Sequence, residues 1–144
     1  MAKNERNYME LTFSSSEENA TFASSVVKAF ATQLKFTYGE LCDIKTAVRE
    51  ATMNAVIHAY PDIVGKVSVR ATIFNDNVIE IKVRDWGCGI ENVEKAREPL
   101  FTTVTTTGAG YSGMGFTIME SFMDSVKVQS NTGKGTTVTM RRCI

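Results

Sequence analysis

The sequence is short of several residue types that mark particular kinds of protein. It holds one histidine, three cysteines and two prolines among 144 residues. The single histidine, His58, excludes a metal site built from two histidines of one chain. The cysteines Cys42, Cys88 and Cys143 are odd in number and far apart. This pattern fits a reducing compartment, and it predicts neither a disulfide framework nor a zinc site.

The chain also lacks an excess of charge and a long apolar run. Sixteen basic and sixteen acidic residues give a formal net charge of zero, and no basic run stands out, which argues against nucleic acid as the main ligand. No apolar stretch approaches the roughly 20 residues that span a bilayer. The first 19 residues contain no apolar segment typical of a signal peptide. We therefore expect a cytoplasmic protein without direct contact to nucleic acid or membrane.

What the chain does have is the composition and patterning of a globular α+β protein. Hydrophobic residues make up 43% of it and charged residues 22%, and its length suits one domain over residues 1–144. Alternating segments predict strands. Helix starts are predicted at the serine N-cap of residues 14–16 and at the capping box formed by Thr37 and Glu40. The predicted order is strand, two helices, two strands, helix, two strands. Because tight turns join consecutive strands, we expect a mostly antiparallel sheet with helices on one face, a two-layer sandwich. The predicted strands are 8–13, 66–74, 78–84, 125–130 and 136–142, and the predicted helices are 17–33, 40–58 and 115–123.

Glycines cluster just before the last predicted helix. Residues 108–113 match G-x-G-x-x-G, the dinucleotide-binding fingerprint, but that loop requires a parallel βαβ unit and an acidic residue about 20 positions later. The expected sheet is antiparallel, and no acid ends the strand at that distance. The alternatives are a surface loop without a ligand, or a helix start whose free N–H groups suit a polyphosphate.

Two polar residues share a face of the helix predicted at 40–58. Glu50 and Asn54 are four positions apart, so they project from successive turns of one side. A carboxylate can accept a proton, and an amide oxygen is a suitable ligand for Mg²⁺. Taken alone, the pair is better explained as an exposed glutamate and an amide that bonds a neighbour. On the same helix, His58 has no nucleophile elbow nearby, which favours packing or capping over catalysis.

Two further motifs lie at strand ends. Asp85 ends a predicted strand and is followed by Gly87 and Gly89, so its carboxylate could accept a hydrogen bond from an exocyclic amine while a planar ring passes over the glycines. Residues 133–137 (GKGTT) lead into the last strand. Each motif alone is equally compatible with an ordinary turn.

The order and spacing of these motifs together resemble the ATP-binding site of the GHKL superfamily. This superfamily includes DNA gyrase, MutL, histidine kinases and certain serine kinases. Within it, the chain is most similar to the sporulation anti-sigma factor kinases that inhibit sigma-F, over residues 13–140. The segments that carry the resemblance are REATMNAVIHAY (49–60), VRDWGCGI (83–90), EPLFTT (98–103), SGMGFTIMESFMD (112–124) and GKGTTV (133–138).

The resemblance implies a role for each motif residue in a site for ATP or ADP with Mg²⁺. Glu50 matches the general base, and Asn54 matches the magnesium ligand. Asp85 matches the acceptor of the adenine amine. Residues 91–114 correspond to the ATP lid. The other matched nucleotide-binding positions are Gly87, Gly89 and Thr136 at the adenine end, and Gly113 and Gly115 at the phosphates.

The resemblance also implies a function in transcription regulation. We expect an anti-sigma factor that sequesters a sporulation sigma factor, phosphorylates a serine of an anti-anti-sigma protein, and works as a homodimer. One alternative is a nucleotide-gated binding module without kinase activity. The other is a histidine-kinase catalytic domain, which would need a pair of helices carrying a phosphoacceptor histidine.

Overall fold

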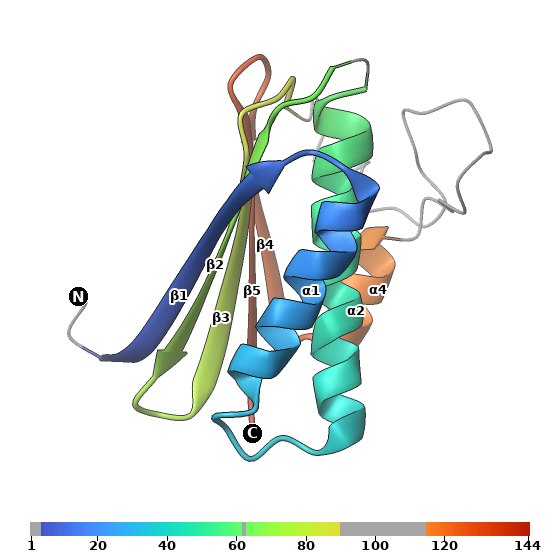
Figure 1. Cartoon of the computed structure of the whole chain (residues 1–144). Helices are drawn as coiled ribbons and strands as arrows, with labels where there is room; N and C mark the ends of the chain where they lie inside the picture. The colour runs from blue at the N-terminus through green and yellow to red at the C-terminus, as the bar shows by residue number, and fades with distance from the viewer. Residues whose placement is uncertain (1–3, 62, 90–114) are drawn as a thin grey trace.

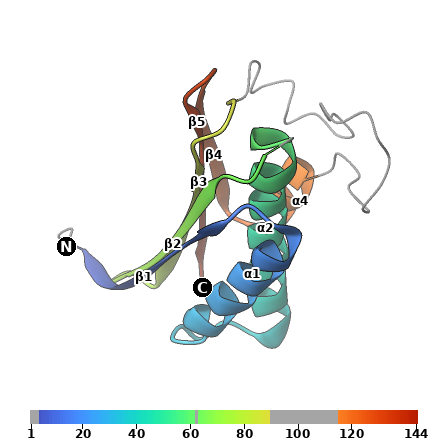
Figure 2. The same ribbon diagram turned by 45° about the horizontal axis from the view of Figure 1, so that its top comes forward.

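The fold is a five-stranded antiparallel sheet covered on one face by helices (Figures 1 and 2). The computed structural model describes residues 4–61, 63–89 and 115–144. The strand order is β1-β2-β3-β5-β4, and every neighbouring pair is antiparallel. This confirms the predicted α+β sandwich. In chain order the elements are β1 (Glu5–Ser14), α1 (Glu17–Ala31), α2 (Tyr38–Asn54), η1 (Ala55–Ala59), β2 (Lys66–Phe74), β3 (Val78–Asp85), α4 (Gly115–Phe122), β4 (Ser125–Asn131) and β5 (Gly135–Cys143).

The strands lie where alternation predicted them, with one larger difference. β2 has its predicted bounds, β3 and β4 are longer than predicted by one residue at one end, and β5 is longer by one residue at each end. β1 begins at Glu5 instead of residue 8, because its pairing with β2 continues past a register shift between Glu5 and Asn7 to Phe74. Backbone hydrogen bonds to a neighbouring strand extend β1 beyond the part with a clear side-chain pattern.

The first two helices begin at the predicted caps. The Ser16 hydroxyl accepts the N–H of Asn19 at 3.3 Å, and α1 ends at Ala31, two residues before the predicted position. At α2, the Glu40 N–H donates to the Thr37 hydroxyl at 3.1 Å while the Thr37 N–H donates to the Glu40 carboxylate at 2.8 Å. This reciprocal pair confirms the predicted capping box.

The end of the second helix differs from the prediction in its winding. The helical path continues to Ala59, close to the predicted end at residue 58, but its last five residues form the π-helix η1. Single π turns inside helices occur often at functional sites. Here the wider turn carries the chain from α2 toward the end of β3.

The core lies between the helices and the inner face of the sheet. Val67, Val69, Ile79, Ile81 and Val83 alternate along β2 and β3 and are buried against the helices. The same alternation places Asp85, the last residue of β3, on this inner face. None of the helices within the described ranges is long and apolar enough to cross a membrane.

Candidate functional site

Most of the predicted site residues meet at one end of the molecule. The C-terminal end of α2, the end of β3 and the β4–β5 turn lie together at the top of Figure 1. α4 packs along α2 and begins beside it (Figure 2). The fold therefore brings together motifs that are up to 86 positions apart in the sequence, from Glu50 to Thr136.

Glu50 and Asn54 lie on successive turns of α2, as predicted. Glu50 is partly buried, and this burial raises the pKa of its carboxyl, with the neighbouring Arg49 acting in the opposite direction. A carboxylate with a raised pKa accepts a proton more readily, which is a property expected of a general base.

Asn54 lies directly against the start of α4. A β-carbon added to Gly115 would stand 3.2 Å from both Oδ1 and Nδ2 of Asn54. A side chain at this position would crowd the amide, which would then have to shift by a few tenths of an ångström. The structure thus places Asn54 beside the helix N-terminus that the glycine motif predicted, where the helix dipole favours negative charge.

Asp85 is buried at the end of β3, with 6% of its surface exposed. Its Oδ1 accepts the N–H of Gly87 at 3.0 Å and the N–H of Thr136 at 3.2 Å. Within the described part of the chain, its Oδ2 accepts no hydrogen bond. Burial raises the pKa of Asp85, and the two backbone hydrogen bonds only partly oppose this. One oxygen is therefore fixed by the fold while the other keeps its accepting capacity.

Three glycines of this region, Gly87, Gly89 and Gly135, lie where a side chain would collide with backbone. A β-carbon at Gly87 would overlap the carbonyl and β-carbon of Ala59, the last residue of η1. Gly89 has φ +78°, and its β-carbon would overlap the Asn131 carbonyl. Gly135 has φ +110°, and its β-carbon would overlap the Asp85 carbonyl. The absence of side chains keeps the β3 end, η1 and the β4–β5 turn in close contact.

Thr136 completes this cluster. It is buried next to Asp85, and its hydroxyl is 2.7 Å from the hydroxyl of Ser130 on β4. The structure therefore brings Asp85, Gly87, Gly89 and Thr136 into one group. Gly113 and the predicted lid at 91–114 lie outside the described residues.

The predicted magnesium ligand, Asn54, would supply a single amide oxygen to a bound ion. The residues that the structure describes include no group of three or more His, Cys, Asp or Glu side chains that could hold a metal ion by themselves. Mg²⁺ is commonly held by one or two protein oxygens together with substrate phosphates and water. The Asn54 amide beside the start of α4 could supply such a ligand.

Sequence reasoning missed Tyr60 and the backbone of Cys88. Tyr60 is buried, and its hydroxyl accepts the N–H of Trp86 at 2.7 Å and donates to the Lys66 carbonyl at 2.8 Å. The Cys88 N–H donates to the Ala59 carbonyl at 3.2 Å, and the Cys88 carbonyl accepts the Gly133 N–H at 2.7 Å. All of these contacts except the one between Tyr60 and Lys66 join residues far apart in sequence, so no local pattern could have indicated them.

His58 is partly buried, which agrees with its predicted packing role. It lies in η1, where burial lowers the pKa of its imidazole, and its carbonyl accepts a hydrogen bond from the Cys88 thiol at 3.1 Å. The neutral ring is therefore favoured near neutral pH.

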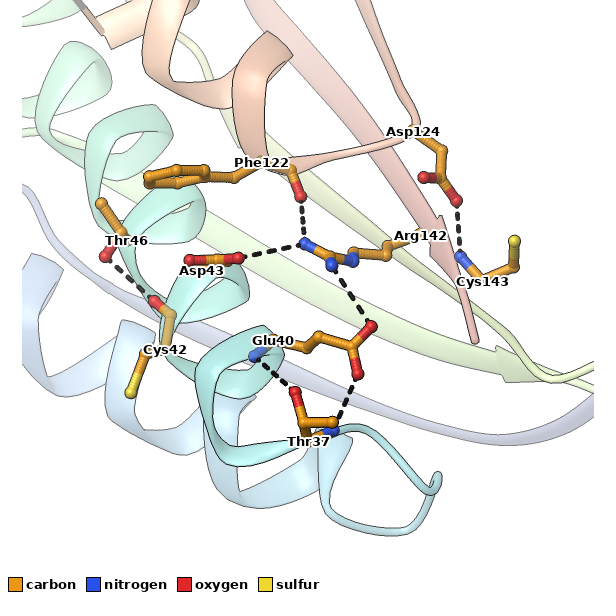
Figure 3. A network of polar contacts seen from close by, with 9 residues as sticks. All are labelled: Thr37, Glu40, Cys42, Asp43, Thr46, Phe122, Asp124, Arg142 and Cys143. Carbon is orange, nitrogen blue, oxygen red and sulfur yellow. Dashed lines mark hydrogen bonds and ion pairs between the residues drawn. The ribbon is translucent and has the colours of Figure 1, made fainter.

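A polar network holds the far end of α4 (Figure 3). Arg142 of β5 donates to the carbonyl of Phe122, the last residue of α4, at 2.6 Å. The same guanidinium bonds Glu40 at 3.3 Å and Asp43 at 3.5 Å, both in the first turns of α2. Arg142 thus ties α4 to α2 and to the sheet, and so orients the helix that begins beside Asn54.

Comparison with known proteins gives this arrangement a family. The histidine kinase-like ATPase domain family matches residues 13–142. An anti-sigma F factor of Caldanaerobacter subterraneus subsp. tengcongensis is 52% identical, with 96% of this chain and 94% of the relative covered. The anti-sigma F factors of Clostridium acetobutylicum and Geobacillus stearothermophilus are 48% and 51% identical, over 94% and 95% of this chain and 93% and 92% of theirs.

Solved structures agree at the level of the fold. The mycobacterial sensor histidine kinase MprB superimposes with a TM-score of 0.58 at 18% identity, covering 94% of this chain and all of that one. The blue-light activated histidine kinase EL346 of Erythrobacter litoralis gives 0.53 at 17% identity, over 88% of this chain and 40% of that one. The chain belongs to the histidine kinase-like, or GHKL, ATPase family and, within it, to the anti-sigma F factors.

Proposed function

We propose that this protein binds Mg-ATP, inhibits a sporulation sigma factor, and phosphorylates a serine of an anti-anti-sigma protein. The observation that carries the proposal is the assembly of Glu50, Asn54 and the start of α4 at one end of α2, with buried Asp85 at the end of β3. The anti-sigma F relatives, about half identical over nearly the whole chain, support the choice of partners.

The adenine end of the nucleotide would lie at Asp85. Its Oδ2 is the available acceptor for the exocyclic amine, since Oδ1 already holds two backbone N–H groups. Thr136 holds the carboxylate from the β5 side, and Gly87 and Gly89 leave room for a planar base against the backbone. Either ATP or ADP offers the same adenine to these groups.

The phosphate end would lie beside the Asn54 amide, at the N-terminus of α4. Backbone N–H groups of a helix N-terminus bind phosphate oxygens, and Gly113 and Gly115 would allow close approach. Bound Mg²⁺ would neutralise phosphate charge, with the Asn54 amide oxygen as its protein ligand. Glu50, one turn before Asn54, would orient the incoming serine hydroxyl and accept its proton. Phosphoryl transfer depends mainly on such positioning and charge stabilisation.

The family supports the choice of partners. Because the relatives are named anti-sigma F factors, we propose a sigma-F-like factor as the inhibited partner and a location in the cytoplasm. We propose that it acts as a homodimer, with no direct role for nucleic acid or membrane.

A nucleotide-gated binding module is the second candidate, because it would need the same pocket. The partly buried Glu50 with its raised pKa favours catalysis over gating alone. The histidine-kinase alternative is weaker, because the solved histidine kinases are only 17–18% identical to this chain. The one histidine, His58, lies within η1 and is partly buried, which does not suit a phosphoacceptor.

The test is a reaction with γ-labelled ATP, Mg²⁺ and a cognate anti-anti-sigma protein, followed by phosphopeptide mapping. We expect phosphoserine on the partner and capture of the sigma factor by the ATP-bound protein. A protein that binds ATP and sigma factor without ever labelling the partner would establish the binding module instead. Label found only on His58 would support a histidine kinase.

A further inference from the structure

Tyr60 joins three segments that surround the proposed adenine end of the site. It follows η1 directly and has 8% of its surface exposed. Its hydroxyl accepts the N–H of Trp86 at 2.7 Å and donates to the carbonyl of Lys66 at 2.8 Å. Trp86 follows Asp85 immediately, so this hydrogen bond acts on the backbone that carries the proposed adenine acceptor.

The aromatic ring of Tyr60 is itself held in place. A β-carbon on Gly65 would overlap the ring, so Gly65 gives it a flat surface against which to pack. Gly65 is fixed in turn by Ser15, because its N–H donates to the Ser15 hydroxyl and its carbonyl accepts the Ser15 N–H, each at 2.9 Å. The hydroxyl of Tyr60 is therefore a fixed point and not a mobile surface group.

The other backbone hydrogen bonds of the loop after β3 act at later residues. The Ala59 carbonyl holds the N–H of Cys88, and Gly133 donates to the Cys88 carbonyl. The Asp85 side chain bonds the N–H of Gly87. The backbone directly after Asp85 is therefore held by the side chain of another segment: the Tyr60 hydroxyl accepts the Trp86 N–H.

We propose that Tyr60 is a positioning residue for base recognition: its hydroxyl holds the backbone at Trp86 so that Asp85 Oδ2 faces the exocyclic amine of adenine. This inference rests on the proposed nucleotide site and adds a determinant of its specificity. Tyr60 itself does not touch the base. It acts by restricting where the Asp85 carboxylate can lie, because a hydrogen bond between carboxylate and amine weakens steeply when its distance or angle is wrong.

The experiment compares ATP with ITP, in which a carbonyl replaces the exocyclic amine of the base. Calorimetric titrations with the Mg²⁺ complex of each nucleotide would give two affinities for the wild type, for Tyr60→Phe and for Tyr38→Phe. Tyr38 is the matched control, since it is exposed at the start of α2 and its ring contact with Lys28 is kept by phenylalanine. Asp85→Asn shows how far the ratio of ATP to ITP affinity falls when the acceptor itself is lost, because it keeps Oδ1 and turns the base-facing oxygen into an N–H donor.

We expect Tyr60→Phe to weaken ATP binding about tenfold, the effect of one well-placed hydrogen bond, and ITP binding much less. The ratio of ATP to ITP affinity in Tyr60→Phe would then fall toward the ratio in Asp85→Asn, whereas Tyr38→Phe would keep the wild-type ratio. A purely structural role for Tyr60 would lower the melting temperature and leave the ratio unchanged, and that result would overturn the inference.

Amide hydrogen exchange on the unmodified protein gives a measurement that does not depend on a variant. The Trp86 N–H should exchange as slowly as the amides inside β3, and rapid exchange would overturn the proposal even if Tyr60→Phe failed to fold. A wild-type protein without affinity for ATP would instead overturn the proposed function. ATP binding with an unaltered nucleotide ratio in Tyr60→Phe would overturn this inference alone.

Discussion

The partial burial of Glu50 suits its proposed role as a general base but lowers the stability of the fold when the carboxyl is ionised. Burial raises the pKa of its carboxyl, so the folded protein binds the proton more strongly than the unfolded chain does. The free energy of unfolding therefore falls as the pH rises from about 4.3, the usual glutamate pKa, through the raised value. Above that value the cost of burying the carboxylate is fully present.

Glu50→Gln should separate these two effects. Loss of a general base lowers the phosphorylation rate by roughly 10²–10⁴-fold, while the similar shape of glutamine leaves ATP affinity nearly unchanged. The variant should also melt at a higher temperature than the wild type at pH 7, and this difference should vanish below about pH 4, where the wild-type carboxyl is protonated.

Asn54→Ala is the comparison variant on the same helix face. It removes the proposed magnesium ligand and should impair both ATP binding and turnover. Phosphorylation rates, calorimetric ATP affinities and melting curves between pH 3 and 8 would check the pair. A Glu50→Gln protein that phosphorylates its partner at the wild-type rate contradicts the role given to Glu50.

At the scale of elements, the turn between β4 and β5 controls how closely the strands approach the end of β3. Gly135 has φ +110° and faces the Asp85 carbonyl, where a β-carbon does not fit. Gly133 also has a positive φ, +80°, but a β-carbon there would meet no atom within 4 Å. A side chain at Gly133 would therefore cause backbone strain alone, whereas a side chain at Gly135 would cause both backbone strain and steric overlap.

We expect Gly135→Ala to lower the free energy of unfolding by about 3 kcal/mol or more, because strain and overlap add. Gly133→Ala should cost about 1–2 kcal/mol, from its left-handed backbone alone. Urea unfolding of both variants measures the difference. Gly135→Ala should also weaken ATP binding, since relief of the overlap moves Asp85. Equal stabilities for the two variants would show that the turn tolerates the extra carbon.

At the scale of the whole molecule, the site depends on α4 being held at both ends. One end begins against Asn54, and the other is bonded through Phe122 to Arg142, which also reaches Glu40 and Asp43 (Figure 3). Arg142 is partly buried, so its bond to the Phe122 carbonyl is not replaced by water without cost.

Arg142→Met should lower the free energy of unfolding by roughly 1–2 kcal/mol and weaken ATP binding, although Arg142 lies at the opposite end of α4 from Asn54. Lys127→Met is the matched control, because it removes one positive charge from an exposed position on β4. Urea midpoints and calorimetric ATP affinities would distinguish them. If both variants weaken ATP binding equally, the loss of charge is responsible and not the anchoring of α4.

The sequence by itself determined the elements and the identity of the motif residues. Alternation located β2 and β3, and the capping box located the start of α2, because these signals depend on residues a few positions apart. The same periodicity put Glu50 and Asn54 on one helix face. It also put Asp85 at a strand end, before two glycines.

Only the tertiary structure decided which of these residues meet and what holds them. The strand order brings Thr136 to Asp85, and the end of η1 explains why residue 87 is a glycine. The bond between the Tyr60 hydroxyl and the Trp86 backbone spans 26 positions and has no sequence signature. Such contacts depend on how separate elements pack. Sequence periodicity indicates whether a segment is a helix or a strand, but it does not indicate which other segments lie beside it.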